Sequence, residues 1–495
     1  MKLFRASVTL LAVSSALLSS CTMMSKPDTL KFDPTKYTSG TTTVNGKTYK
    51  YRAYTVVYVA NPVDSKYQSM NIYVPEEYFA GGSVGSYNAQ SAPIFLPNQV
   101  GGYMPGEPGD ITKPPMGGSA DTPNAMQVAL SRGYVVASPG ARGRTNKDAS
   151  GQFYGKAPAA IVDLKAAVSY LHYNDAAMPG NAERIVSNGT SAGGALSALL
   201  GATGDNKDYA PYLKALGAAP ASDAIYAVSA YCPITNLDHA DAAYEWEFNG
   251  VNDYQKLQIT QDTSYQMQRT LVNGTLTTDQ IAVSDALKPQ FTPYLNSLNL
   301  KNGDQALTLD AQGNGTFKTY MASWIQKSAQ RALDAGADLS KVSYLTIQNG
   351  KVTGVDFDAY AKGIGRMKTP PAFDGLSLEN GENTLFGTSS VDARHFTAYG
   401  TQNSKVAATT ADPQTVKLMN PMDYISAPDT RTAPYWRIRV GTADKDTSHA
   451  ISAVLATKLT NTGHDVDYWL PWNVPHSGDY DLTELFDWMD KVVAK

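Results

Sequence analysis

The sequence predicts an α/β fold with a mostly parallel central sheet, helices on both faces of that sheet, and a large inserted lid domain. Strand-like and helix-like patterns alternate on both sides of residues 236–417, a stretch rich in Asn, Gln, Asp and Thr. A glycine-rich turn at residues 189–193 also joins one predicted strand directly to a predicted helix. With 495 residues and 42% hydrophobic content, the chain is long enough to bury a sizeable core.

The N-terminus is typical of a bacterial export signal. Lys2 and Arg5 precede an apolar run at residues 8–18, which is too short to span a bilayer as a mature helix. We therefore expect a signal peptide over residues 1–20.

The end of this run, "LLSSC", resembles a bacterial lipobox, in which the chain is cut before the cysteine and the cysteine receives a lipid. The sequence thus predicts lipidation of Cys21, a polar tether over residues 21–40, and secretion across the inner membrane. The lipid would be the only contact with a membrane, and Thr22 favours the outer membrane in a Gram-negative host. Ordinary signal cleavage with an incidental cysteine is the alternative.

The charge and the cysteine content exclude several functions. A net charge of −4 and the lack of a basic stripe argue against a nucleic-acid partner. Only two cysteines occur, so lipidation of Cys21 leaves Cys232 without an intramolecular disulfide partner. The chain has no His-Glu-x-x-His motif and no cysteine cluster, so we expect neither a metal site nor a cofactor.

Residues 41–235 are predicted to form the first part of the core. Two antiparallel strands at residues 47–63 and 65–79 follow an Asn-Gly pair that is typical of hairpin turns. Strands and helices then alternate, with strands at residues 92–103, 134–144, 183–189 and 223–233 and helices at residues 124–133, 157–173 and 192–202.

Residues 236–417 are predicted to be the lid, because a structureless loop of that length is implausible in a compact fold. They contain helical patterns at residues 265–274 and 319–338 and a hairpin pattern at residues 344–357. Residues 418–495 resume the core, with strands at 433–442 and 465–472 and helices at 448–463 and 481–495.

The turn at residues 189–193 reads Gly-Thr-Ser-Ala-Gly and fits the G-x-S-x-G nucleophile elbow of α/β-hydrolases. Glycines flank the serine because the turn is strained and crowded. Ser191 is therefore the candidate nucleophile, and the N–H of Ala192 is a candidate donor to the oxyanion. The alternative is that Ser191 is only a small residue in a tight turn.

A catalytic serine needs a base, and the chain offers six histidines. In α/β-hydrolases the acid and then the histidine follow the serine on loops after late strands. His476 lies on such a loop, before the last predicted helix, and is the predicted base. His172 precedes the serine, and His239 and His395 lie in the insertion. His464 opens a strand at the wrong end of the sheet. His449 begins a helix, and we expect it to cap that helix or face solvent.

The acid should follow the strand at residues 433–442, where the next loop contains Asp444 and Asp446. Spacing alone does not choose between them, since one can hold His476 while the other points into the pocket. A helix N-terminal charge is the alternative role and applies more to Asp446. The second oxyanion donor is expected at Gly101 or Gly102, whose backbone can approach a substrate closely. The alternative is that these glycines only form a simple turn.

Several segments together resemble the subtype B group of bacterial tannases, which are α/β-hydrolases with a large inserted lid. The resemblance rests on residues 98–106, 187–205, 229–246, 366–374, 381–387, 440–448 and 473–481, and it extends from about residue 45 to the C-terminus. It implies that Asp444 completes a triad with Ser191 and His476. It also implies that Lys368, Glu382 and Asp446 bind the three phenolic hydroxyls of a galloyl ring, and that the substrate is a galloyl ester.

Three other functions remain as alternatives. A feruloyl or general carboxylesterase would use the same triad without three polar lid contacts. A peptidase of the prolyl-oligopeptidase type also uses a similar serine motif, although the chain shows no propeller repeat. A lipoprotein that binds tannins or glycans without catalysis would be the remaining class.

Overall fold

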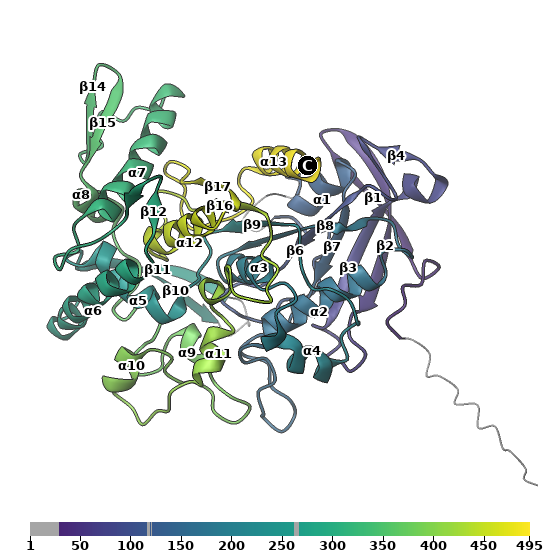
Figure 1. The fold of residues 1–495 in the computed structure, drawn as a ribbon, viewed down its shortest axis with the longest axis horizontal. Helices are drawn as coiled ribbons and strands as arrows, with labels where there is room; N and C mark the ends of the chain where they lie inside the picture. The colour runs from purple at the N-terminus through teal and green to yellow at the C-terminus, as the bar shows by residue number, and fades with distance from the viewer. Residues whose placement is uncertain (1–28, 116–118, 120, 262–266) are drawn as a thin grey trace, which may run out of the picture.

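A nine-stranded sheet forms the centre of the core and extends from the right side of Figure 1 to its middle. The structure is a computed structural model that describes residues 29–115, 119, 121–261 and 267–495. The strand order is β1-β2-β3-β7-β6-β8-β9-β16-β17, antiparallel from β1 to β7 and parallel from β7 to β17. The strands are β1 (Thr38–Val44), β2 (Lys47–Val57), β3 (Ser69–Pro75), β6 (Pro93–Pro97), β7 (Val135–Pro139), β8 (Asn181–Thr190), β9 (Ala227–Tyr231), β16 (Tyr435–Arg439) and β17 (Asp465–Trp469).

The sequence explains both halves of this sheet. Every residue of β6, β7 and β9 is buried, as continuous apolar runs predict for parallel strands covered on both faces. At the other edge, β1 and β2 form a hairpin closed by Asn45 and Gly46, whose φ angles of 50° and 76° are those that an Asn-Gly turn supplies. The short hairpin β4 (Ser83–Val84) and β5 (Tyr87–Asn88) lies outside the sheet.

Helices cover both faces of the sheet (Figure 1). On one face α1 and α13 pack together, and Phe486 of α13 contacts the rings of Phe95 and Tyr134 edge-on. On the other face α2, α3 and α12 share one apolar core. The bounds are α1 (Ala125–Ser131), α2 (Ala159–Tyr173), α3 (Ala192–Ala202), α4 (Ala210–Leu216), α12 (His449–Asn461) and α13 (Leu482–Val493).

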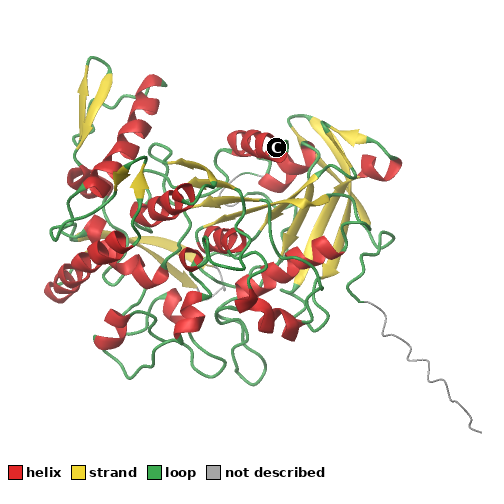
Figure 2. Cartoon of the chain, viewed as in Figure 1, coloured by secondary structure: helices red, strands yellow, loops and turns green. Residues whose placement is uncertain are grey.

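The chain between β9 and β16 is an insertion, since these two strands are neighbours in the sheet. None of the strands described in this insertion joins the central sheet; they form three separate hairpins on the side of the molecule away from β1 (Figures 1 and 2). The helices are α5 (Leu237–Phe248), α6 (Thr278–Ser297), α7 (Thr316–Asp334), α8 (Phe357–Ile364), α9 (Gly381–Leu385), α10 (Ala398–Gln402) and α11 (Pro413–Lys417). The hairpins are β10 (Asp253–Gln261) with β11 (Met267–Thr275), β12 (Lys301–Asn302) with β13 (Gln305–Ala306), and β14 (Leu345–Gln348) with β15 (Lys351–Val355).

The predicted fold class is confirmed, and the predicted core strands and helices are present in order. The helix expected at residues 265–274 is wrong, because β11 pairs there with β10 along nine antiparallel residue pairs. Hydrogen bonding and side-chain packing between the two strands of a hairpin override local helix preference here. The boundaries of the lid at residues 236 and 417 stay a prediction.

The folded part of the chain begins earlier than expected. Leu30 and Phe32 are buried, and the Asn174 side chain bonds to the backbone of both, so packing starts inside the stretch predicted as a tether. The predicted signal peptide and Cys21 lie outside the described residues. Within the part of the chain that is described, no helix combines the length and the apolar character needed to cross a membrane.

Candidate active site

Ser191 lies at the turn between β8 and α3 with φ 60° and ψ −122°, a left-handed conformation that is strained for a serine. Its N–H donates to the carbonyl of Tyr231 at the end of β9, at 2.9 Å, which fixes the turn against the neighbouring strand. Ala192 is the first residue of α3, where the backbone N–H has no acceptor within the helix. The predicted nucleophile and the predicted oxyanion donor are thus adjacent at a helix N-terminus.

The glycines of the elbow are required by close backbone contacts. A Cβ at Gly193 would lie 2.6 Å from both the Asn98 side chain and the Val100 carbonyl oxygen. Asn98 also donates to the Gly193 carbonyl at 3.0 Å. These contacts hold the loop after β6 against the first turn of α3.

Gly101 and Gly102, the other predicted oxyanion donors, follow directly in this loop. Gly101 accepts a bond from the Met104 N–H at 2.9 Å, and Gly102 has a φ of 54°, so the two residues belong to a tight turn. Arg144 donates to the Gly102 carbonyl at 2.8 Å and to Thr384 of α9 at 2.6 Å. Arg144 therefore connects the loop after β6 to the insertion, a contact that the sequence did not reveal.

Asp444 and His476 meet across the loops that follow β16 and β17. The Asp444 carboxylate is buried and lies 2.9 Å from His476 Nδ1, and its other oxygen accepts the Asp446 N–H at 2.9 Å. Burial opposes ionisation, but the charge and hydrogen bond of His476 outweigh it and lower the pKa of Asp444 to about 2. The geometry thus separates the two candidate acids: Asp444, not Asp446, bonds to Nδ1.

Ser191 and His476 form no hydrogen bond with each other in the described structure. Their loops are nevertheless in contact, because a Cβ at Gly478 would collide with Thr190, the residue before the serine. Asn188 of β8 also donates to Asp479 at 2.9 Å. Catalytic hydrogen bonds are often long without substrate and tighten when it binds.

Asp446 bridges His476, the predicted base, and the insertion. One of its oxygens lies 3.3 Å from His476 Nε2 and the other lies 3.1 Å from the Lys368 ammonium. Although burial opposes a charge on His476, Asp444 and then Asp446 raise its pKa well above the ordinary value. Lys368 also lies over the ring of Phe373, at 4.0 Å from the centroid.

Glu382 lies in the first turn of α9 and faces the same charges. Burial raises its pKa, and the Lys368 ammonium opposes that rise. Burial likewise disfavours the charge of Lys368, but Asp446 and Glu382 raise the pKa of that ammonium. The structure therefore brings together the three residues that the resemblance assigned to a ligand.

Helix α5 supports this group with side chains that the sequence analysis missed. The Tyr244 hydroxyl donates to the Lys445 carbonyl at 2.8 Å and accepts the Lys368 N–H at 3.1 Å. Glu245 forms a fully buried ion pair with Arg366, and Arg366 donates to the Lys368 carbonyl at 2.8 Å. Helix α5 thus positions both the loop that carries Asp444 and Asp446 and the predicted ligand-binding residue Lys368.

His449 is fully buried, contrary to the expectation that it caps a helix or faces solvent. Its Nδ1 lies 2.7 Å from the Glu247 carboxylate and its Nε2 lies 3.0 Å from the Gly441 carbonyl. Both partners can only accept, so both ring nitrogens carry protons. Burial opposes this charge, but Glu247 raises the pKa of His449 to about 9. The pair could not be foreseen because the partners are 202 residues apart.

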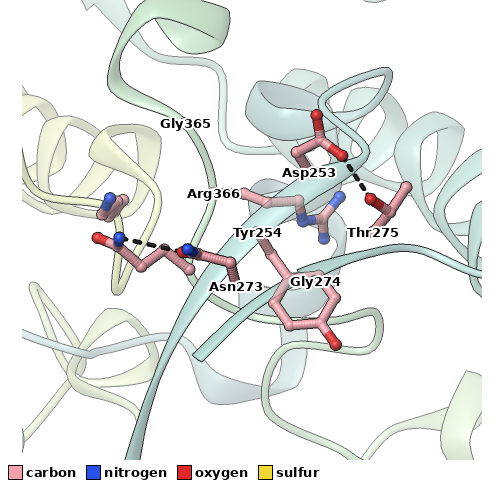
Figure 3. A pocket seen from close by; sticks show the side chains of 9 residues that line it. Asp253, Tyr254, Asn273, Gly274, Thr275, Gly365 and Arg366 are labelled. Carbon is pink, nitrogen blue, oxygen red and sulfur yellow. Dashed lines mark hydrogen bonds between the residues drawn. The ribbon is translucent and has the colours of Figure 1, made fainter. Parts of the chain in front are cut away.

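A cavity of about 570 Å³ is lined by the β10–β11 hairpin together with Arg366 and Lys445 (Figure 3). The hairpin wall is closed by bonds between Asp253 and Thr275 and between Gln255 and Asn273. None of the predicted site residues lines this cavity. The cavity thus meets the loop of Asp444 and Asp446 at Lys445, although neither of those two acids lines it.

The chain is similar in sequence and structure to known proteins. A family profile described as BD-FAE matches residues 116–285. A tannase from Fusobacterium nucleatum is 53% identical, with a TM-score of 0.89, over 94% of this chain and 99% of that one. A tannase from Lactobacillus plantarum is 45% identical with a TM-score of 0.90, and a tannin acyl hydrolase in complex with ethyl gallate is 45% identical with a TM-score of 0.88, both over the same shares. No curated protein matches the chain.

The buried pair of His449 and Glu247 yields a prediction on stability. Glu247→Gln leaves a buried imidazolium without its counter-charge, so the free energy of unfolding should fall by about 3 kcal/mol or more. The folded pKa of about 9 exceeds the unfolded value of 6.5, so this stabilisation is complete below pH 6.5 and is lost as the pH rises through 9. Urea unfolding at several pH values should show that decline in wild type and a flatter profile in the variant.

The matched control is Glu484→Gln, which breaks the exposed ion pair with Arg331. That change should cost no more than about 1 kcal/mol. Equal losses in the two variants would contradict the special role of the buried pair.

Proposed function

Because the chain belongs to the tannase family of α/β-hydrolases, we propose that it hydrolyses galloyl ester bonds through a triad of Ser191, His476 and Asp444. As a family member it is a tannin acyl hydrolase, which is a carboxylic ester hydrolase. The observation that carries the more specific proposal is the position of Asp446, between the imidazole of His476 and the ammonium of Lys368. A ligand held by Lys368 and Asp446 would lie beside the base.

In the proposed acylation step, His476 Nε2 takes the proton of Ser191 and the serine oxygen attacks the ester carbonyl carbon. Asp444 keeps the proton of His476 on Nδ1 and stabilises the imidazolium that forms. The N–H of Ala192 and an N–H of Gly101 or Gly102 bind the oxyanion, since the loop after β6 is held against α3.

The tetrahedral intermediate then collapses, the alcohol leaves with the proton from His476, and the galloyl group remains on Ser191. Water, deprotonated by His476, hydrolyses this acyl-enzyme and releases gallic acid. The reaction needs no redox group, since each step moves only a proton and an acyl group.

Recognition of the galloyl ring is assigned to Lys368, Glu382 and Asp446. Carboxylates accept bonds from phenolic hydroxyls, and an ammonium stabilises partial phenolate character. The similar enzyme in complex with ethyl gallate supports a small galloyl ester as ligand. A feruloyl esterase of the same fold would not gain from three polar contacts around the ring.

Two proposals concern the rest of the chain. We propose that residues 236–417 act as a lid that contributes the ring-binding side chains Lys368 and Glu382. We also propose that the protein is exported and anchored through a lipid on Cys21, on the strength of the lipobox-like "LLSSC".

Removal of the nucleophile tests the catalytic proposal. Ser191→Ala should lower kcat for methyl gallate by at least about 10⁴-fold while leaving the fold intact. A fluorophosphonate should label wild type at Ser191, as located by mass spectrometry of the digested protein. Unchanged turnover in the variant, or labelling elsewhere, would refute the assignment.

The ring contacts can be tested by substrate selectivity. Glu382→Gln should lower kcat/KM for methyl gallate by roughly 10- to 100-fold, because one charged acceptor is lost, and should hardly affect methyl benzoate. The control Glu379→Gln changes an exposed acid three residues earlier and should leave both substrates unaffected. Wild type should also prefer methyl gallate to methyl ferulate; equal rates would favour the feruloyl esterase.

The contact between Asp446 and His476 predicts a shift in the pH–rate profile. The base must be neutral, so kcat/KM should rise as His476 loses its proton. Asp446→Asn removes a charge that raises the pKa of His476, so the ascending limb should move to lower pH. Measurement with an ester that lacks ring hydroxyls separates this effect from substrate binding, and an unmoved limb would contradict the contact.

A further inference from the structure

A thiol lies beside the proposed triad although no step of ester hydrolysis uses it. Cys232 directly follows β9, is fully buried, and donates through Sγ to the Ser477 carbonyl at 3.3 Å. One ligand atom each from Cys232, Asp444 and His476 lie within 4.8 Å of one another. These residues come from the loops after three adjacent parallel strands, so the sheet itself brings them together.

We propose that Cys232, Asp444 and His476 form an inhibitory site for a thiophilic divalent cation such as Zn²⁺ or Cd²⁺. Sulfur, imidazole nitrogen and a carboxylate oxygen are the donors that such cations combine in proteins. In a tetrahedral zinc site the donors lie roughly 3.3–3.8 Å apart, so closing the cluster requires a shift of about 1 Å. Water would fill the fourth position.

Charge balance favours a divalent cation here. Binding releases the Cys232 thiol proton to solvent and frees Nδ1 of His476, whose single remaining proton is then on Nε2, so a thiolate, a carboxylate and a neutral imidazole bind the cation. Their two negative charges neutralise the cation, which matters because Cys232 and Asp444 are fully buried. The imidazole is 22% exposed and provides the route of entry.

Inhibition follows from which atom the cation takes. A cation on Nδ1 replaces the hydrogen bond between His476 and Asp444 at 2.9 Å, so the imidazole loses both its orientation and its basicity at Nε2. Mg²⁺ and Ca²⁺ prefer oxygen donors and should not compete. The inhibitory effect rests on the proposed function, whereas binding of the cation does not.

Binding can be measured without any turnover. In a full-length Ser191→Ala chain that also carries Cys21→Ser, Cys232 is the single thiol, since the chain has two cysteines. Titration with Cd²⁺ should produce the ultraviolet charge-transfer band of a cadmium–thiolate bond with one equivalent bound. The band should disappear with Cys232→Ser, and Asp444→Asn should weaken Cd²⁺ binding at least about tenfold.

Inhibition is measured on the active Cys21→Ser chain with methyl gallate. Zn²⁺ should inhibit reversibly, EDTA should restore the rate, and Mg²⁺ should have no effect. Cys232→Ser and Cys232→Ala should retain turnover and require at least about ten times more Zn²⁺ for half inhibition.

Absence of the cadmium band, or equal Zn²⁺ sensitivity with and without the thiol, would overturn the proposal. A chain that binds Cd²⁺ through Cys232 but does not hydrolyse methyl gallate would support the metal site and refute the proposed substrate.

Discussion

The buried carboxylates of α5 are the interaction on which the rest of the site depends. This single helix carries Asp241, Glu245 and Glu247, all buried in the interior. Asp241 accepts the backbone N–H groups of Phe373 and Asp374 at 2.7 and 3.1 Å, while the other two form ion pairs with Arg366 and His449. Because an unpaired buried charge is so costly, Glu245 and Glu247 fix the segments that carry Arg366 and His449. Burial raises the pKa of Asp241 to about 8, and this side chain holds its segment through hydrogen bonds.

This arrangement couples the binding half of the site to its catalytic half. Tyr244 and Arg366 hold the backbone around Lys368, and the same tyrosine also holds the loop that carries Asp444 and Asp446. The proposed acid, the proposed ring-binding lysine and the bridging Asp446 therefore share one rigid support. The site is best regarded as an interface between core and insertion, in which neither part has a complete set of functional groups.

Local pattern and long-range pairing contributed differently to what could be predicted. The apolar runs of β6, β7 and β9 and the tight turn at Ser191 are encoded within a few residues, so the core strands and the strand–turn–helix unit could be predicted from sequence. The His449–Glu247 pair and the position of Cys232 each depend on residues distant in sequence. The β10–β11 hairpin depends on pairing between two strands. No local periodicity reports such contacts. Spacing alone left Asp444 and Asp446 open as the acid, and only the family resemblance pointed to Asp444, the one that lies against His476 Nδ1.

The position of the insertion between two neighbouring strands has a consequence for how the chain folds. Strands β9 and β16 pair in parallel, yet roughly 200 residues separate them, which adds an entropic cost of about 5 kcal/mol for bringing their ends together. During synthesis, β16 and β17 emerge only after the whole insertion has left the ribosome. Until then β9 is an exposed, apolar sheet edge, and such edges invite aggregation. If α5 folds early onto its partners in the insertion, fewer residues remain disordered between β9 and β16. The helix that supports the proposed site would then also lower the risk of aggregation during synthesis.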